Sequence, residues 1–159
     1  MNTSHLPHLI TAATLSPSDR DALVAGAHAL QRAEALGALP RLLEGKNIGL
    51  LCTAPESAEA ALFERAASEL GARVARISPE LPGTLGADDR RRTARTLGRL
   101  YDAIECQGLA DEWLQGIRAE AGVPVYGGAA CAHHPSAALA ADADQRRHVL
   151  QALLLSTIV

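Results

Sequence analysis

Apolar residues recur along most of the chain in blocks, and the spacing inside a block follows one of two patterns. After Ser16, a residue type that often caps helices, they recur at helical intervals, as at Leu23 and Leu30. Residues 47–52 instead form a continuous apolar run, which is typical of a parallel strand buried on both faces. The pattern therefore predicts both helices and strands.

The two patterns alternate to the end of the chain. Later helices are predicted at 56–70, 88–101, 111–121 and 144–157, and later strands at 73–78, 103–106 and 123–126. Each parallel return needs a crossover that a helix supplies, so this order predicts an α/β fold: a three-layer domain with a four-stranded parallel sheet flanked by helices. We expect residues 1–159 to form a single domain.

Ligands of open α/β sheets bind beyond the carboxyl ends of the strands. Four connections follow the predicted strands and would line such a site, at residues 52–57, 79–87, 107–108 and 127–135. Candidate chemistry is therefore sought in these loops.

Composition narrows the classes of function. A net charge of −3 and 3% aromatic residues exclude a nucleic-acid-binding surface, which needs cations for phosphates and rings for bases. Three cysteines without a CxxC pair predict neither a disulfide framework nor a zinc site, and favour a reducing, cytoplasmic location. The first 15 residues lack an export signal and the apolar tail 150–159 is too short for a membrane span.

Several short runs carry a family resemblance through their order and spacing. Residues 45–64, the run Thr93–Arg99 with the strand after it, and Val123–Val125 with His134–Pro135 resemble the carbamoyl-phosphate-binding domain of aspartate and ornithine carbamoyltransferases. Residues 144–158 resemble the C-terminal helix of these transcarbamoylases, which returns from their second domain. The resemblance implies a transcarbamoylase-like chain whose second, amino-acid-binding domain is deleted and whose final helix is retained.

The resemblance also identifies the positions that would hold the ligand. The family turn Ser-Thr-Arg-Thr-Arg binds phosphate through backbone N–H groups, hydroxyls and guanidinium groups at a helix start. Here the aligned residues are Glu56, Ser57, Ala58, Glu59 and Ala60. Thr84 takes the place of the glutamine in the family's Gln-Leu-Gly-Lys loop, and Gln107 takes the place of a family arginine. His134 corresponds to the family histidine that contacts the carbamoyl oxygen. This chain therefore lacks the cations of the family's phosphate site.

The two glutamates at this turn have two interpretations. Thr53 and Glu56 fit a capping box, and acids in a first helical turn interact favourably with the helix dipole. Alternatively, Glu56 and Glu59 bind a cationic group. We prefer the capping interpretation.

The candidate binding residues are Ser57, Thr84, Gln107, His133 and His134, and no catalytic residue is assigned. His133 and His134 lie near Cys131, but their spacing matches no established zinc pattern, so neither a metal nor a cofactor is expected.

We expect a protein without carbamoyltransferase activity that acts as a structural or regulatory module. The resemblance implies self-association as a homotrimer, or assembly with a full-length transcarbamoylase, with neither nucleic acid nor membrane as a partner. Two alternatives stay open: a small-molecule-binding protein or enzyme that uses a strand-end pocket around His134, and residual carbamoyltransferase-related activity in amino-acid metabolism.

Overall fold

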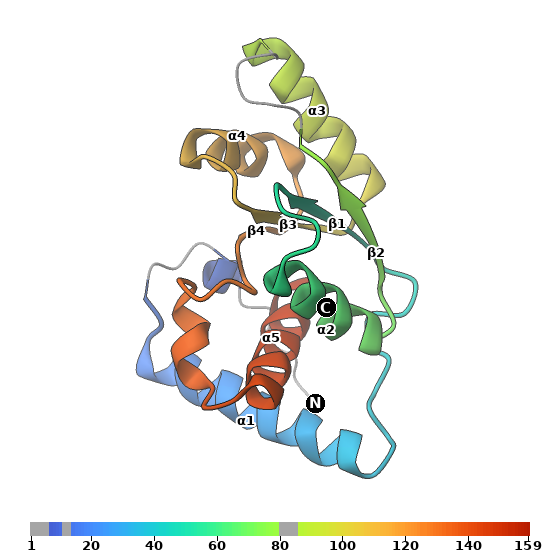
Figure 1. Ribbon diagram of the computed structural model, residues 1–159, viewed down its shortest axis with the longest axis vertical. Helices are drawn as coiled ribbons and strands as arrows, with labels where there is room; N and C mark the ends of the chain where they lie inside the picture. Colours follow the sequence, from blue (N-terminus) through green and yellow to red (C-terminus); the bar gives the residue numbers. More distant parts are fainter. Residues whose placement is uncertain (1–6, 11–13, 80–85) are drawn as a thin grey trace.

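The computed structural model describes residues 7–10, 14–79 and 86–159 of the chain. Helices and strands alternate as the sequence predicts (Figure 1). In chain order the elements are the 3-10 helix η1 (Pro7–Ile10), α1 (Pro17–Ala35), β1 (Asn47–Cys52), α2 (Ala58–Glu69), β2 (Arg73–Ile77), α3 (Ala87–Leu100), β3 (Ala103–Gln107), α4 (Asp111–Ala121), β4 (Val125–Gly127), the 3-10 helix η2 (Pro135–Leu139) and α5 (Ala143–Ile158).

The four strands form one parallel sheet in the order β2-β1-β3-β4, which confirms the predicted fold class. The chain runs outward from β1 to β2 and then crosses back to β3 on the other side of β1. Cys52, which ends β1, pairs with Gln107, which ends β3. In α/β sheets a crevice forms where neighbouring strands lead away in opposite directions, so this pair marks the place for a ligand.

Helices cover both faces of the sheet (Figure 1). On one face lies the larger apolar cluster, which contains Leu50, Phe63 and Leu153 and joins the sheet to α1, α2 and α5. On the other face, Trp113 and Ile117 belong to a second cluster that joins the sheet to α3 and α4. Each such side chain contributes about 1.5–3 kcal/mol when it is fully buried, so the two clusters hold the layers together.

Helices α3 and α4 approach each other at a glycine. A Cβ atom on Gly98 would lie 1.7 Å from the carbonyl oxygen of Ala121, which is closer than any two such atoms come. Gly98 therefore lets the end of α4 rest directly on α3.

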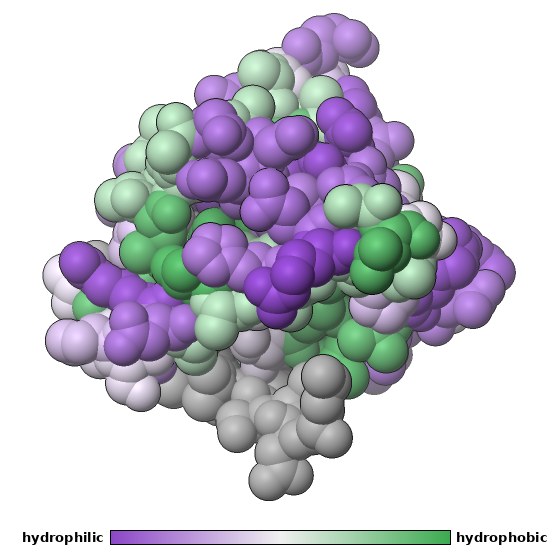
Figure 2. All heavy atoms as spheres, turned by 90° about the horizontal axis from the view of Figure 1, so that it is seen from below, coloured by the Kyte–Doolittle hydropathy of each residue, from purple (hydrophilic) through white to green (hydrophobic). Residues whose placement is uncertain are grey.

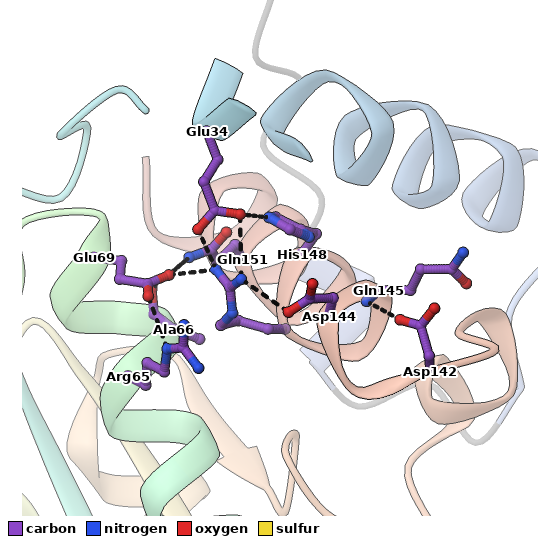
Figure 3. A network of polar contacts seen from close by, with 10 residues as sticks. Glu34, Arg65, Ala66, Glu69, Asp142, Asp144, Gln145, His148 and Gln151 are labelled. Carbon is purple, nitrogen blue, oxygen red and sulfur yellow. Dashed lines mark hydrogen bonds and ion pairs between the residues drawn. The ribbon is translucent and has the colours of Figure 1, made fainter. Parts of the chain in front are cut away.

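Helix α5 contacts α1 and α2 through buried polar groups as well as apolar ones (Figure 3). The side chain of Arg147 is 4% exposed; it donates to Glu34 of α1 at 2.9 Å and to Glu69 of α2 at 2.5 Å. His148 Nε2 lies 2.8 Å from the Glu34 carboxylate. One guanidinium thus joins three helices, and both of these partners have a further contact, Glu69 with Arg65 and Glu34 with His148.

The end of the molecule formed by α1 is largely hydrophilic, and hydrophobic residues occur there in separate groups (Figure 2). None of the helices in the described ranges is both long enough and apolar enough to cross a membrane.

Most of the boundaries predicted for the helices and strands differ from the observed ones by at most one residue, but two elements begin two residues later than predicted. The helix expected from residue 56 begins at Ala58, because Ser57 adopts the extended conformation of a cap. The strand expected at 123–126 is shifted to Val125–Gly127, and Pro124 before it contributes only its carbonyl oxygen, which accepts from Ile104.

Candidate ligand site

Ser57 caps α2, the helix that follows β1. Its Oγ accepts a hydrogen bond from the backbone N–H of Ala60 at 3.1 Å, which satisfies one of the free donors of the first turn. The capping box expected between Thr53 and Glu56 is therefore wrong, since the cap lies at Ser57 and Glu56 precedes it. The error arises because Thr53 and Ser57 are both residue types that cap helices.

The acid that does occupy the first turn is Glu59. There its carboxylate interacts favourably with the positive end of the helix dipole, by about 0.3–1 kcal/mol. Ala58 is exposed, but Ala60 is fully buried in the larger core cluster. Of the two positions aligned with family arginines, only position 58 therefore faces outward.

A cavity of about 140 Å³ lies between this turn and the ends of β1 and β3. It is lined by Thr53, Ala54, Ser57, Glu59, Gln107, Gly108 and Cys131. Gly108 has a positive φ of 77°, and a Cβ atom on it would lie 2.1 Å from the hydroxyl oxygen of Thr53. Glycine at this position therefore lets the backbone after β3 approach the turn after β1.

Glu105 fixes the loop that follows β4. It lies in the middle of β3, fully buried, and its carboxylate accepts from three consecutive backbone N–H groups, those of Gly128, Ala129 and Ala130, at 2.9–3.1 Å. The Nε2 of Gln107 donates to the same carboxylate at 3.2 Å. Burial raises the pKa of Glu105 to about 7, although these four donors act in the opposite direction.

Arg146, in the first turn of α5, holds the same loop from the other side. Its guanidinium donates to the carbonyl oxygens of Ala129 and Cys131, at 2.5 and 3.4 Å, and to Ser136 Oγ at 3.3 Å. The loop between β4 and η2 is thus held both by a strand of the sheet and by the final helix.

His134 acts as the cap of η2. Its Nδ1 accepts from the backbone N–H of Ser136 at 3.2 Å, so the neutral ring carries its proton on Nε2. Burial, with the Arg146 guanidinium next in effect, lowers the pKa of His134 to about 4, so the ring is neutral at physiological pH. His133 is exposed, and its Nε2 lies 3.2 Å from the Gly127 carbonyl oxygen.

The thiol groups near the strand ends are poorly suited to nucleophilic attack, which requires the thiolate. Burial, followed by the charges of Glu105 and Glu59, raises the pKa of Cys131 to about 11. Burial likewise raises the pKa of Cys106 to about 12. Within the described ranges, no group of three or more histidine, cysteine or acidic side chains is arranged to hold a metal ion.

The predicted binding residues do not all line one cavity. Ser57 and Gln107 line the same cavity, whereas His133 and His134 are not among its lining residues. Thr84 lies outside the described residues. The sequence interpretation missed Cys131 as a wall of the cavity, and it missed Glu105 and Arg146 as the groups that hold the loop. A carboxylate inside the apolar strand at 103–106 was the available signal for Glu105, since such a charge is rarely buried without partners.

Comparison with known proteins finds carbamoyltransferases. A family model described as aspartate/ornithine carbamoyltransferase, carbamoyl-P binding domain, matches residues 7–143. The ornithine carbamoyltransferase of Cutibacterium acnes is 34% identical over 141 residues, which are 89% of this chain and 42% of that protein. The catabolic ornithine carbamoyltransferase of Burkholderia mallei is 39% identical over 109 residues, 69% of this chain and 32% of that protein.

Solved structures of carbamoyltransferases share the fold of this chain over part of their length. Aspartate transcarbamoylase from Trypanosoma cruzi, in complex with N-(phosphonacetyl)-L-aspartic acid, superposes with a TM-score of 0.62 at 26% identity, over 76% of this chain and 39% of that one. Ornithine carbamoyltransferase from Pyrococcus furiosus superposes with a TM-score of 0.63 at 23% identity, over 79% and 39%. The chain thus spans about two fifths or less of each of these proteins.

Proposed function

Because the chain belongs to the aspartate/ornithine carbamoyltransferase family through its carbamoyl-phosphate-binding domain, we propose that it is a non-catalytic member with a structural or regulatory role. The observation that carries the proposal is the composition of the cavity beside the phosphate-turn positions. Glu59 is the only charged side chain among the described residues that line it.

The chemistry of phosphate binding explains why this matters. A hydrogen bond to a charged group contributes about 1.5–3 kcal/mol, and several are needed to hold a dianion. Ala58 and Ala60 supply none, and Glu59 adds repulsion. Ala60, buried in the core, leaves no space for a guanidinium without repacking. An anionic phosphate should therefore bind this chain far more weakly than it binds a turn that carries arginines.

The position of α5 supports the interpretation that a second domain is deleted. Helix α5 begins at Ala143, soon after η2 ends at Leu139, and packs on α1 and α2. The connection of a few residues leaves no room for another domain between the two elements. A transcarbamoylase-like chain of this kind would lack the part that binds the amino-acid substrate.

Thermal unfolding with freshly dissolved carbamoyl phosphate, and separately with inorganic phosphate, tests the loss of the site. We expect no rise in Tm at millimolar concentration, whereas a ligand at 100 times its Kd would stabilise the fold by about 2.7 kcal/mol. The matched gain-of-function variant is Ala58→Arg with Glu59→Thr, and its control is Glu56→Gln, which removes an acid outside the cavity without restoring the family's serine. Stabilisation of the unmodified chain by carbamoyl phosphate would refute the proposal.

We further propose that the chain self-associates as a homotrimer or joins a full-length transcarbamoylase, as the family resemblance implies. Light scattering at micromolar concentration should give a mass three times that of the 16.6 kDa chain. Co-expression with a full-length transcarbamoylase, followed by affinity purification through this chain, tests the mixed assembly. A monomer mass together with no co-purification would refute both forms of assembly.

A further inference from the structure

Helix α3 concentrates positive charge on one exposed side. Five of the chain's 15 lysine and arginine residues lie between positions 90 and 99, although the chain as a whole has a net charge of −3. Four exposed arginines form a stripe around one open depression of about 430 Å³: Arg91, Arg92, Arg95 and Arg99. Asp88 and Thr96 complete its lining. The charge of this arginine stripe is therefore opposite to that of the chain.

The shape of the stripe fits an elongated ligand. All the lining residues belong to α3, so the depression is the side of one helix and not a cleft between two elements. Figure 1 shows this helix at the end of the molecule opposite α1. Arg91, Arg95 and Arg99 are four residues apart, which separates them by about 6 Å along the helix axis, and the whole stripe is about 16 Å long. A compact anion could reach only neighbouring guanidinium groups.

The guanidinium groups of the stripe keep most of their donors free of protein acceptors. The pairs Asp88–Arg91 and Asp89–Arg92 are 3.6 and 3.9 Å apart, which is longer than a hydrogen bond. Among the described residues, the hydrogen bond from Arg95 Nε to a carboxylate of α4, at 2.9 Å, is the only one that these four groups donate. Each guanidinium offers five N–H donors in a fork that matches a carboxylate. The stripe can therefore bind several carboxylates at once.

The spacing of the stripe does not serve the helix itself. Side chains four residues apart are neighbours on a helix surface, and like charges at this spacing are destabilising. Arg91 with Arg95, and Arg95 with Arg99, form two such pairs. A bound segment of negative charge would relieve the repulsion in both.

The surroundings of the stripe favour a polypeptide over a nucleic acid. Leu100 follows Thr96 by four residues, which places it on the same side of the helix, and it is 60% exposed. It offers an apolar contact that a polypeptide side chain can match and a sugar-phosphate backbone cannot. The described residues that line the depression include no aromatic ring on which a base could stack.

We propose that this side of α3 is a docking surface for an acidic segment of a partner protein. Carboxylates of the segment pair with the arginine stripe, and an apolar side chain of the segment contacts Leu100. The proposal goes beyond the non-catalytic role and does not rest on it. The phosphate and light-scattering experiments above report on the turn before α2 and on the mass of the chain, so their outcomes leave this surface untested.

Fluorescence anisotropy of the full chain, with a labelled peptide of eight glutamates and one leucine as the probe, tests the proposal. We expect saturable binding with a Kd of about 10–100 µM at about 50 mM salt, and at least about tenfold weaker binding at about 300 mM salt, because exposed charges are screened. A peptide with glutamine in place of glutamate should not bind. Equal or tighter binding of a single-stranded oligonucleotide with eight phosphates would show a general polyanion surface and overturn the proposal.

Exposed arginines on two helices provide matched double variants. Arg92→Gln with Arg99→Gln should weaken binding of the acidic peptide at least about tenfold, because it removes two forks from the stripe. Arg20→Gln with Arg32→Gln removes the same charge from α1 and should change the Kd by less than about twofold. Equal weakening by the two double variants would show attraction to the overall charge of the chain and overturn the proposal. Unchanged binding by the stripe variant would do the same.

A variant that keeps every charge tests the apolar contact. Leu100→Ser should weaken binding of the peptide that contains leucine by about threefold and leave the binding of a peptide of glutamate alone unchanged. The side chain is largely exposed, so this variant should retain the Tm of the unmodified chain. An equal effect on the two peptides would refute the contact with Leu100.

Discussion

Glu105 and His134 should give the folded state two opposite dependences on pH. Both groups are buried beside the loop that follows β4, and burial disfavours the charged form of each. For a carboxyl, this raises the folded pKa, and for an imidazole it lowers it. The two contributions to the free energy of unfolding therefore change in opposite directions as the pH changes.

The magnitudes follow from the shifts. The pKa of Glu105 rises from 4.5 to about 7, so its contribution to stability is present below pH 4.5 and is lost as the pH rises through 7. Between about pH 5 and about pH 8 this loss is about 2–3 kcal/mol. The pKa of His134 falls from 6.5 to about 4, so the unfolded chain takes up a proton first and the folded state loses stability on acidification. Over the same interval that loss is about 2 kcal/mol.

In the unmodified chain these two contributions nearly cancel, and single variants should reveal each one. Glu105→Gln removes the contribution of Glu105, so on acidification from about pH 8 to about pH 5 the stability of this variant should fall relative to the unmodified chain by about 2–3 kcal/mol. His134→Asn keeps an oxygen to cap η2 and removes the second, so its relative stability should rise by about 2 kcal/mol.

Urea unfolding followed by circular dichroism at several pH values measures both differences. The contributions of all other titrating groups cancel when each variant is compared with the unmodified chain. Glu105→Gln should also lower stability at every pH, by about 1–3 kcal/mol, because its amide N–H₂ would face the Ala130 N–H. That constant loss does not change how the difference in stability between this variant and the unmodified chain depends on pH. Differences of the same sign for the two variants would refute the reasoning.

Three further changes test the packing and the cap. Arg147→Met should destabilise the fold by about 1–3 kcal/mol in urea unfolding, because it removes the charged hydrogen bonds to two carboxylates that keep one other partner each, and unchanged stability would contradict the role of the network. Gly98→Ala should lower the Tm by well over about 4 °C, since its Cβ would meet the Ala121 carbonyl oxygen, and an unchanged Tm would contradict the close approach of the helices. Ser57→Ala should reduce stability by about 1 kcal/mol through loss of the hydrogen bond to Ala60, and equal stability would refute the assigned cap.

The apolar pattern was sufficient to predict the layers of this fold. A continuous run such as 47–52 can be satisfied only between two covered faces, and the helical spacing of Leu23 and Leu30 indicates one buried side. Boundaries were less accurate, because Thr53 and Ser57 are both good capping residues and only tertiary packing selects between them. The sequence therefore determined the order of elements better than their ends.

The candidate site was predicted in part, for a physical reason. Ser57 and Gln107 follow adjacent strands, and parallel strands bring their carboxyl ends together, so their proximity could be inferred. His134 lies in a loop whose path depends on Glu105 and Arg146, two contacts distant in sequence that no periodicity reveals. Contacts of this kind between distant residues are found only in the folded structure.

The ion pair between Arg147 and Glu34 also constrains the order in which the chain can fold. The two residues are 113 positions apart, so the contact closes most of the 159-residue chain into a loop. Contacts of such long range form late, because the entropy of closure must be overcome before any of them is gained. During synthesis, α1 leaves the ribosome more than 100 residues before α5 does, so the apolar side that α1 buries against α5 stays uncovered during this interval. The nascent chain is thus vulnerable to aggregation through this side of α1 until α5 arrives.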